Sequence, residues 1–61
     1  MTDALETAET AFRIAQLNQQ KAYRIWKVWG GPRAFAQYQK CNRITGEAIV
    51  RLMDIKEELA A

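Results

Sequence analysis

The sequence contains no histidine and no serine, and its 61 residues include one cysteine, one proline and three glycines. Without histidine or serine, a Ser-His-Asp triad and an imidazole base are both excluded. A single cysteine cannot form an internal disulfide, and a zinc site needs about four nitrogen or sulfur ligands. We therefore expect no enzyme activity, no metal, no cofactor and no small-molecule substrate.

Long hydrophobic runs are also absent. The unbroken apolar runs are far shorter than the roughly 20 residues that a membrane-spanning helix needs. A secretory signal begins with basic residues, whereas this chain begins with Asp3 and Glu6. The spacing of these two acidic residues is instead that of a capping box, which predicts the start of a helix. We expect a cytoplasmic protein with no membrane partner.

The chain is rich in apolar side chains and carries little net charge. Hydrophobic residues make up 49%, and nine basic residues stand against seven acidic ones, a net charge of +2. Such a chain is too apolar and too weakly charged to be disordered. A chain of this length buries only about 60% of its unfolded surface, and without a disulfide or metal the usual remedy is self-association.

One break divides the chain, the Gly-Gly-Pro sequence at 30–32. Glycine is favoured just after a helix, and proline is favoured in the first turn of the next one. On either side of the break most residues are good helix formers, such as alanine, leucine, glutamine, lysine and arginine. The sequence therefore predicts a single domain over 1–61, with helices at about 4–29 and 33–59 joined by a turn at 30–32.

Both predicted helices have an apolar seam with alternating steps of three and four residues, the spacing by which helices pack together. The seam of the first helix is Leu5, Ala8, Phe12, Ala15, Gln19, Ala22, Trp26 and Trp29. The seam of the second helix is Ala34, Tyr38, Cys41, Thr45, Ala48, Leu52, Ile55 and Leu59. Folding the chain at the break sets the two seams face to face, with Trp29 opposite Ala34 and Leu5 opposite Leu59.

The polar residues of the seams are predicted to satisfy each other. Gln19 and Thr45 fall at the same level of the folded hairpin, and buried polar groups need hydrogen-bond partners. Cys41 falls opposite Ala22, where a buried thiol is structural rather than reactive. Small residues at this level allow the two helices to approach closely.

A second apolar stripe runs beside each seam, and a two-helix hairpin has no third layer to cover it. A partner must do so, and a second copy is the simplest one. We therefore predict an all-α fold, an antiparallel helical hairpin that pairs as a homodimeric antiparallel four-helix bundle. Asn18 and Asn42 are predicted to set the register of the dimer. The predicted dimer interface comprises Ala11, Ile14, Asn18, Ile25, Phe35, Asn42, Ile49 and Met53.

The distribution of charge favours one orientation of the two copies. Residues 1–10 contain three acidic side chains and no basic one, whereas residues 11–47 contain seven basic side chains and one acidic one. In a hairpin the first and last residues lie together, so each copy has an acidic open end and a basic turn end. Two copies that run in opposite directions place acidic residues beside basic ones at both ends.

In length and shape the predicted dimer resembles the repressor-of-primer type of plasmid RNA-binding bundle, which is also a short hairpin that dimerises. This resemblance covers the architecture alone, because no motif of that family maps onto these residues. It therefore implies a helical bundle and says nothing about function.

An alternative fold is a helix-turn-helix, which implies a DNA-binding regulator. In this fold Thr45 caps a recognition helix, and Gly46 weakens a continuous helix by about 1 kcal/mol. Against it, the turn at 41–43 contains no glycine, and the seam of the second helix is unbroken.

We expect the protein to bind another macromolecule. The first hypothesis is a small regulator or inhibitor of a larger protein, of the kind that phages and plasmids encode. Exposed apolar residues rimmed by cations are typical of such a contact, with Tyr23 and Phe35 at its margin. The second hypothesis uses the cations to bind the phosphates of RNA or DNA. The candidate partner-binding residues are Arg13, Leu17, Lys21, Arg24, Lys27, Val28, Arg33, Lys40 and Arg43.

Overall fold

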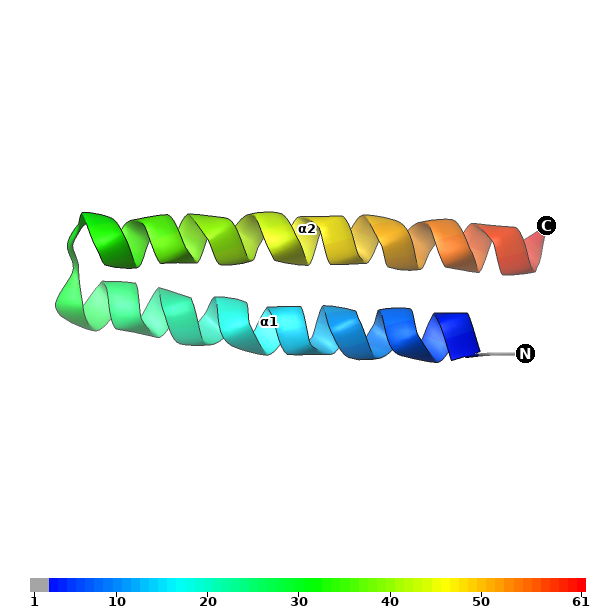
Figure 1. Cartoon of the computed structure of the whole chain (residues 1–61), viewed down its shortest axis with the longest axis horizontal. Coiled ribbons are helices and arrows are strands. Elements are labelled where there is room, and N and C mark those ends of the chain that lie inside the picture. The colour runs from blue at the N-terminus through cyan, green and yellow to red at the C-terminus, as the bar shows by residue number, and fades with distance from the viewer. Residues whose placement is uncertain (1–2) are drawn as a thin grey trace.

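The computed structural model describes residues 3–61, and these residues form two α-helices, α1 (Asp3–Trp29) and α2 (Pro32–Ala60). The helices lie antiparallel and side by side, so that the start of α1 and the end of α2 share one end of the molecule (Figure 1). The Cα trace measures 45 × 13 × 11 Å. The predicted all-α helical hairpin is therefore confirmed. Helix α1 begins one residue earlier than predicted, and α2 extends one residue beyond the prediction at each end.

The turn between the helices depends on two glycines. Gly30 and Gly31 have φ angles of 68° and 88°, in the left-handed region that residues with a Cβ atom rarely adopt. The Gly30 amide donates to the Trp26 carbonyl at 2.8 Å, and the Phe35 amide donates to the Gly31 carbonyl at 3.1 Å. Pro32 stands at the start of α2, where a backbone N–H has no helical partner to lose. Together these residues reverse the chain in a tight turn.

The acidic start of α1 acts through the helix dipole. Asp3 and Glu6 both lie in the first turn of the helix, where negative charge is favoured by the unpaired N–H groups. In the predicted capping box Asp3 would precede the helix, but α1 already includes it. The position before α1 lies outside the described residues.

The core between the helices is narrow. It is made of side chains from the two predicted seams, and most of them are small. Alanines allow the two backbones to approach, but they bury little apolar surface, so the seam stabilises the hairpin only modestly. The buried residues in the described part of the chain are Ala8, Ala15, Ala22, Cys41 and Leu52.

Helix α2 is continuous through Thr45 and Gly46, as the unbroken seam predicts, so the alternative helix-turn-helix fold is wrong. The Thr45 hydroxyl lies 2.8 Å from the Cys41 carbonyl one turn earlier and 3.2 Å from the Ala15 carbonyl of α1. It therefore bonds back into its own helix and across to the other, rather than capping a new helix. A Cβ atom at Gly46 would point into open space.

The prediction is wrong at the ends of the two seams. Trp29 is 82% exposed and Leu59 is 59% exposed, although both were expected in the core. Each lies in the last turn of its helix, where packing neighbours exist on one side only. At the turn end, the Trp26 ring stacks on Tyr38 at 5.5 Å and lies 5.0 Å from Phe35. These rings fill the space between the helices, and Trp29 projects outward.

The polar partners in the seam also differ from the prediction. Nε2 of Gln19 donates a hydrogen bond to Oδ1 of Asn42 across the helices, and both side chains are half-buried. Thr45 bonds to backbone carbonyls instead of to Gln19. The difference follows from side-chain length. The long glutamine side chain extends past the seam to its flank, whereas the short threonine hydroxyl reaches only the nearby backbone.

Candidate functional site

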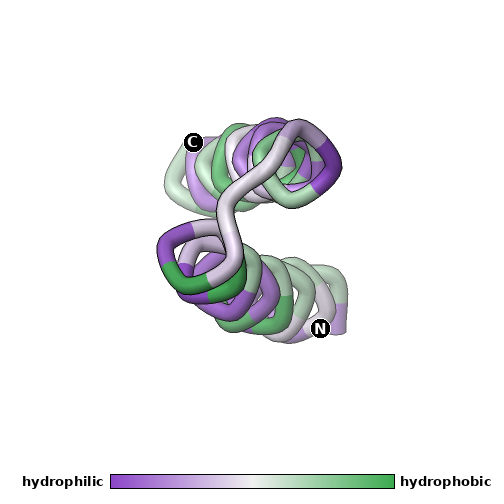
Figure 2. The backbone as a smooth tube through the Cα atoms, turned by 90° about the vertical axis from the view of Figure 1, so that its left-hand side faces the viewer, coloured by the Kyte–Doolittle hydropathy of each residue, from purple (hydrophilic) through white to green (hydrophobic). Residues whose placement is uncertain are grey.

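The hairpin has two broad faces, and each helix contributes one side of each face. When two antiparallel helices pack, the residues just before the seam residues of both helices share one face, and those just after them share the other. Viewed from the turn end, hydrophobic positions occur on the outward sides of the helices as well as between them (Figure 2). Apolar surface therefore remains after the hairpin has formed.

We call the face formed by residues that precede the seam the groove face. Its residues are Ala11, Ile14, Asn18, Lys21, Ile25, Gln37, Lys40, Ile44 and Arg51. We call the opposite face, formed by residues that follow the seam, the aromatic face. Its residues are Tyr23, Phe35, Asn42, Ile49 and Met53.

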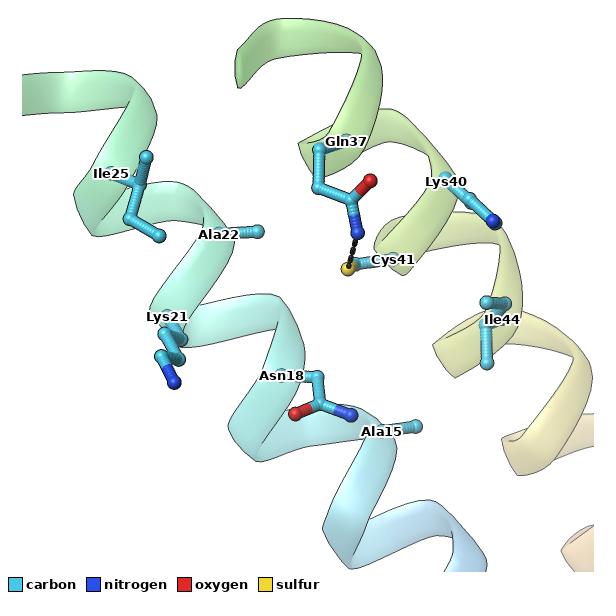
Figure 3. A pocket seen from close by; sticks show the side chains of 9 residues that line it. All are labelled: Ala15, Asn18, Lys21, Ala22, Ile25, Gln37, Lys40, Cys41 and Ile44. Atoms are coloured by element: carbon cyan, nitrogen blue, oxygen red, sulfur yellow. Dashed lines mark hydrogen bonds between the residues drawn. The ribbon is translucent and has the colours of Figure 1, made fainter. Parts of the chain in front are cut away.

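A groove of about 310 Å³ runs between the helices in the middle of the groove face (Figure 3). Its floor consists of the small buried side chains Ala15, Ala22 and Cys41. A second hollow continues along the same face toward the open end, between Ala11 and Arg51. A hollow with a floor of small residues can accept side chains from another helix. Its walls are Asn18, Lys21, Ile25, Gln37, Lys40 and Ile44.

Cys41 is a free thiol buried in the floor of this groove. Its sulfur atom lies 3.9 Å from Nε2 of Gln37, one turn earlier in α2. Burial and a neutral neighbour are typical of a structural cysteine, because a reactive thiol needs exposure and a nearby cation. The position agrees with the structural role that the sequence predicted for it.

Aromatic rings gather at the turn end of the aromatic face. The Tyr23 ring lies 6.1 Å from that of Trp26 and 5.4 Å from that of Tyr38. Nζ of Lys27 lies 5.2 Å from the Trp26 ring centre and 5.5 Å from the Tyr23 ring centre, within the range of a cation–π contact. Lys27, a predicted partner-binding residue, is therefore held against the rings of its own helix.

The structure divides the predicted dimer interface between the two faces. Its α1 residues lie on the groove face and are Ala11, Ile14, Asn18 and Ile25. Its α2 residues lie on the aromatic face and are Phe35, Asn42, Ile49 and Met53. A partner that covers one face leaves the other exposed. Sequence reasoning missed Ile44, which lines the groove with Asn18 and whose place just before a seam residue was the available signal.

The predicted partner-binding residues do not form one patch, although all of them are exposed. The structure places Lys21 and Lys40 at the same groove and Lys27 on the aromatic rings. Val28 and Arg33 also belong to the groove face, because each precedes a seam residue. The other predicted residues lie elsewhere on the two helices and are Arg13, Leu17, Arg24 and Arg43.

Over residues 3–61, no three or more side chains of histidine, cysteine, aspartate or glutamate come together where they could hold a metal ion. Neither described helix is long and apolar enough to cross a membrane. Comparison of the chain with protein-family models, curated proteins and solved structures finds no match.

Proposed function

We propose that this chain is a non-enzymatic binding protein, a helical hairpin that pairs with a second copy and presents its remaining face to a larger protein. In this role it is a small regulator or inhibitor. The proposal rests on one observation, which is that large apolar side chains are exposed on two opposite faces. They are Ile14, Ile25 and Ile44 on the groove face, and Tyr23, Phe35, Ile49 and Met53 on the aromatic face.

The accessible surface of the hairpin supports pairing with a second copy. The chain exposes 5037 Å², whereas a compact monomer of 7.0 kDa exposes about 4,000 Å². The excess is about 1,000 Å² per chain, so two chains that cover it bury about 2,000 Å², the lower end of the range for obligate dimers. Two hairpins in opposite directions form an antiparallel four-helix bundle and set acidic open ends beside basic turn ends.

The aromatic face favours a protein as the second partner. Tyrosine, phenylalanine and methionine are enriched in protein interfaces, and Tyr23, Phe35 and Met53 are exposed on this face. Binding to a nucleic-acid backbone requires clustered cations. On the aromatic face, Lys27 already contacts aromatic rings of its own helix.

A photoreactive amino acid placed on each face tests this function. Met53 and Ile14 are equally suitable positions, because they are 56% and 54% exposed on opposite faces. In cells of the native host, we expect the probe at position 53 to yield an adduct with a different protein. The probe at position 14 should yield an adduct of two copies of this chain. Mass spectrometry identifies both adducts.

Two outcomes contradict the proposal. An adduct at position 53 that contains nucleic acid and disappears after nuclease treatment favours the second hypothesis. In that case Lys40→Glu with Arg43→Glu should abolish binding, and binding should fall steeply as salt rises. A probe at position 53 that gives only the two-copy adduct would show that the aromatic face has no separate protein target.

A further inference from the structure

We infer that the second copy docks on the groove face, about a two-fold axis that passes between Asn18 and Ile44. This inference rests on the pairing proposed above and names the surface that mediates it. When two hairpins lie face to face in opposite directions, the two-fold axis crosses the helices at right angles and maps each helix onto its own counterpart. Helix α1 therefore packs on α1 of the second copy, and α2 packs on α2.

On the groove face, α1 can pack against α1 of a second copy that runs in the opposite direction. Ala11 and Ile25 each lie seven residues from Asn18. An antiparallel pair of α1 helices centred on Asn18 therefore sets the small Ala11 against the large Ile25 of the other copy, and does so twice. Thr7 and Val28, eleven and ten residues from Asn18, lie at nearly matching levels. Small side chains opposite large ones allow two helices to interdigitate.

Asn18 is the polar residue at the centre of this symmetric stripe. Its amide lies at the groove, where Figure 3 shows it beside Ala15. Across the two-fold axis it meets the same amide of the second copy, and two amides can donate to and accept from each other. Asn42 differs, because Gln19 of the same chain already donates to it. The groove face therefore contains the asparagine that suits a symmetric partner.

On the groove face, basic residues of α2 lie beside acidic residues of α2 in a second, antiparallel copy. Its centre is Ile44, which lines the groove across from the centre of the α1 stripe. Reversal about Ile44 brings Lys40 beside Glu47 of the second copy and Arg33 beside Asp54, and all four side chains are exposed. Each pair is weak, but each occurs twice, and opposite charges on facing surfaces select orientation.

The parallel orientation is disfavoured by the same residues. Two copies that run in the same direction place α1 over α2 of the second copy. Lys21 then lies over Lys40, since both line the groove at one level. Like charges that face each other oppose this arrangement.

Disulfide trapping tests the axis directly. Both test variants are made in the Cys41→Ala chain, so that the introduced thiol is the only one. Asn18→Cys lies on the inferred axis, whereas Gln20→Cys is a control at another exposed position, two residues along α1 and off the groove face. Under mild oxidation we expect the position-18 thiol to form a linked dimer at least about tenfold faster than the position-20 thiol, because the two thiols lie within disulfide reach only near the axis.

A second experiment does not depend on substituting Asn18. Copies with Ala11→Cys are mixed with copies with Ile25→Cys, again in the Cys41→Ala chain. We expect the two variants to link to each other faster than either links to itself. Circular dichroism verifies that each variant is helical, and light scattering of the unaltered chain gives its mass.

The outcomes separate this inference from the proposed pairing. A dimeric mass with preferred linkage at position 18 and between positions 11 and 25 supports the groove-face axis. A dimeric mass with preferred linkage at position 20 overturns the axis and leaves the pairing intact. Equal linkage at positions 18 and 20, without preference between 11 and 25, also overturns the axis. A monomeric mass overturns the pairing, and with it the axis.

Discussion

The groove face and the aromatic face belong to the same two helices, yet they differ in form. The groove face is hollow, has a floor of alanines and a buried cysteine, and has Asn18 and Ile44 at its middle. The aromatic face is filled at the turn end by stacked rings, and its central Asn42 is already bonded within the chain. We propose that this difference separates two roles. The hollow face binds a second copy, and the filled face binds a different protein.

The same substitution on each face should give the largest difference between them. Ile44 and Ile49 lie in α2 and are 43% and 40% exposed. Ile44→Asp places two carboxylates together at the inferred axis, and we expect dimerisation to weaken at least about a hundredfold, or roughly 3 kcal/mol. Ile49→Asp should leave the dimer intact. Analytical ultracentrifugation measures both constants, and equal weakening in the two variants would remove the distinction between the faces.

The two asparagines provide a second contrast. Asn42→Leu removes the acceptor of the Gln19 amide and leaves a half-buried polar group without its partner. We expect this to lower the free energy of unfolding by about 1–2 kcal/mol at constant protein concentration, with the dimeric mass retained. Urea unfolding followed by circular dichroism gives the value.

Asn18→Leu is the matched substitution on the groove face. It should keep a stable helical protein but produce a changed or mixed oligomeric state, because a wholly apolar stripe no longer specifies one register. Light scattering measures this state. If Asn18→Leu remains an unchanged dimer, Asn18 has no role in specifying the assembly.

Exchange of charges in α2 should have the smallest effect on dimerisation, and it tests the antiparallel orientation of the two copies. Lys40→Glu and Glu47→Lys should each weaken dimerisation by about three- to tenfold, because each removes two exposed pairs worth less than about 1 kcal/mol apiece. The double variant should recover most of the affinity, and the effect should shrink at high salt. A double-mutant cycle measures the coupling. Additive losses in the double variant would contradict contact between these two positions.

Much of the fold could be predicted from the spacing of apolar residues. The seam of alternating three- and four-residue steps contains every buried residue among residues 3–61, such as Ala8 and Leu52, because a 3.6-residue period sets which side chains share one side of a helix. The turn at the Gly-Gly-Pro sequence could also be predicted from the sequence. The spacing did not predict that Trp29 and Leu59 are exposed, because periodicity contains no information on where the opposite helix stops providing contacts.

Less of the candidate site could be predicted. The sequence showed both outward stripes, but sequence reasoning joined them into one interface. In α1 the stripe precedes the seam residues, as Asn18 precedes Gln19, whereas in α2 it follows them, as Asn42 follows Cys41. Reversal of the chain at the turn sends such stripes to opposite faces. The hydrogen bond from Gln19 to Asn42 was also missed, since it depends on side-chain reach across the seam.

Residue order alone predicts two long helices, the point where they meet, and most of the side chains that pack between them. Those properties follow from local conformational preference and from the helical period, both of which can be read from neighbouring residues. The packing of the two helices sets which face each remaining side chain joins, which polar groups pair, and that Ile44 shares a groove with Asn18. These depend on the direction and depth at which one helix lies on the other, and no single helix contains that information.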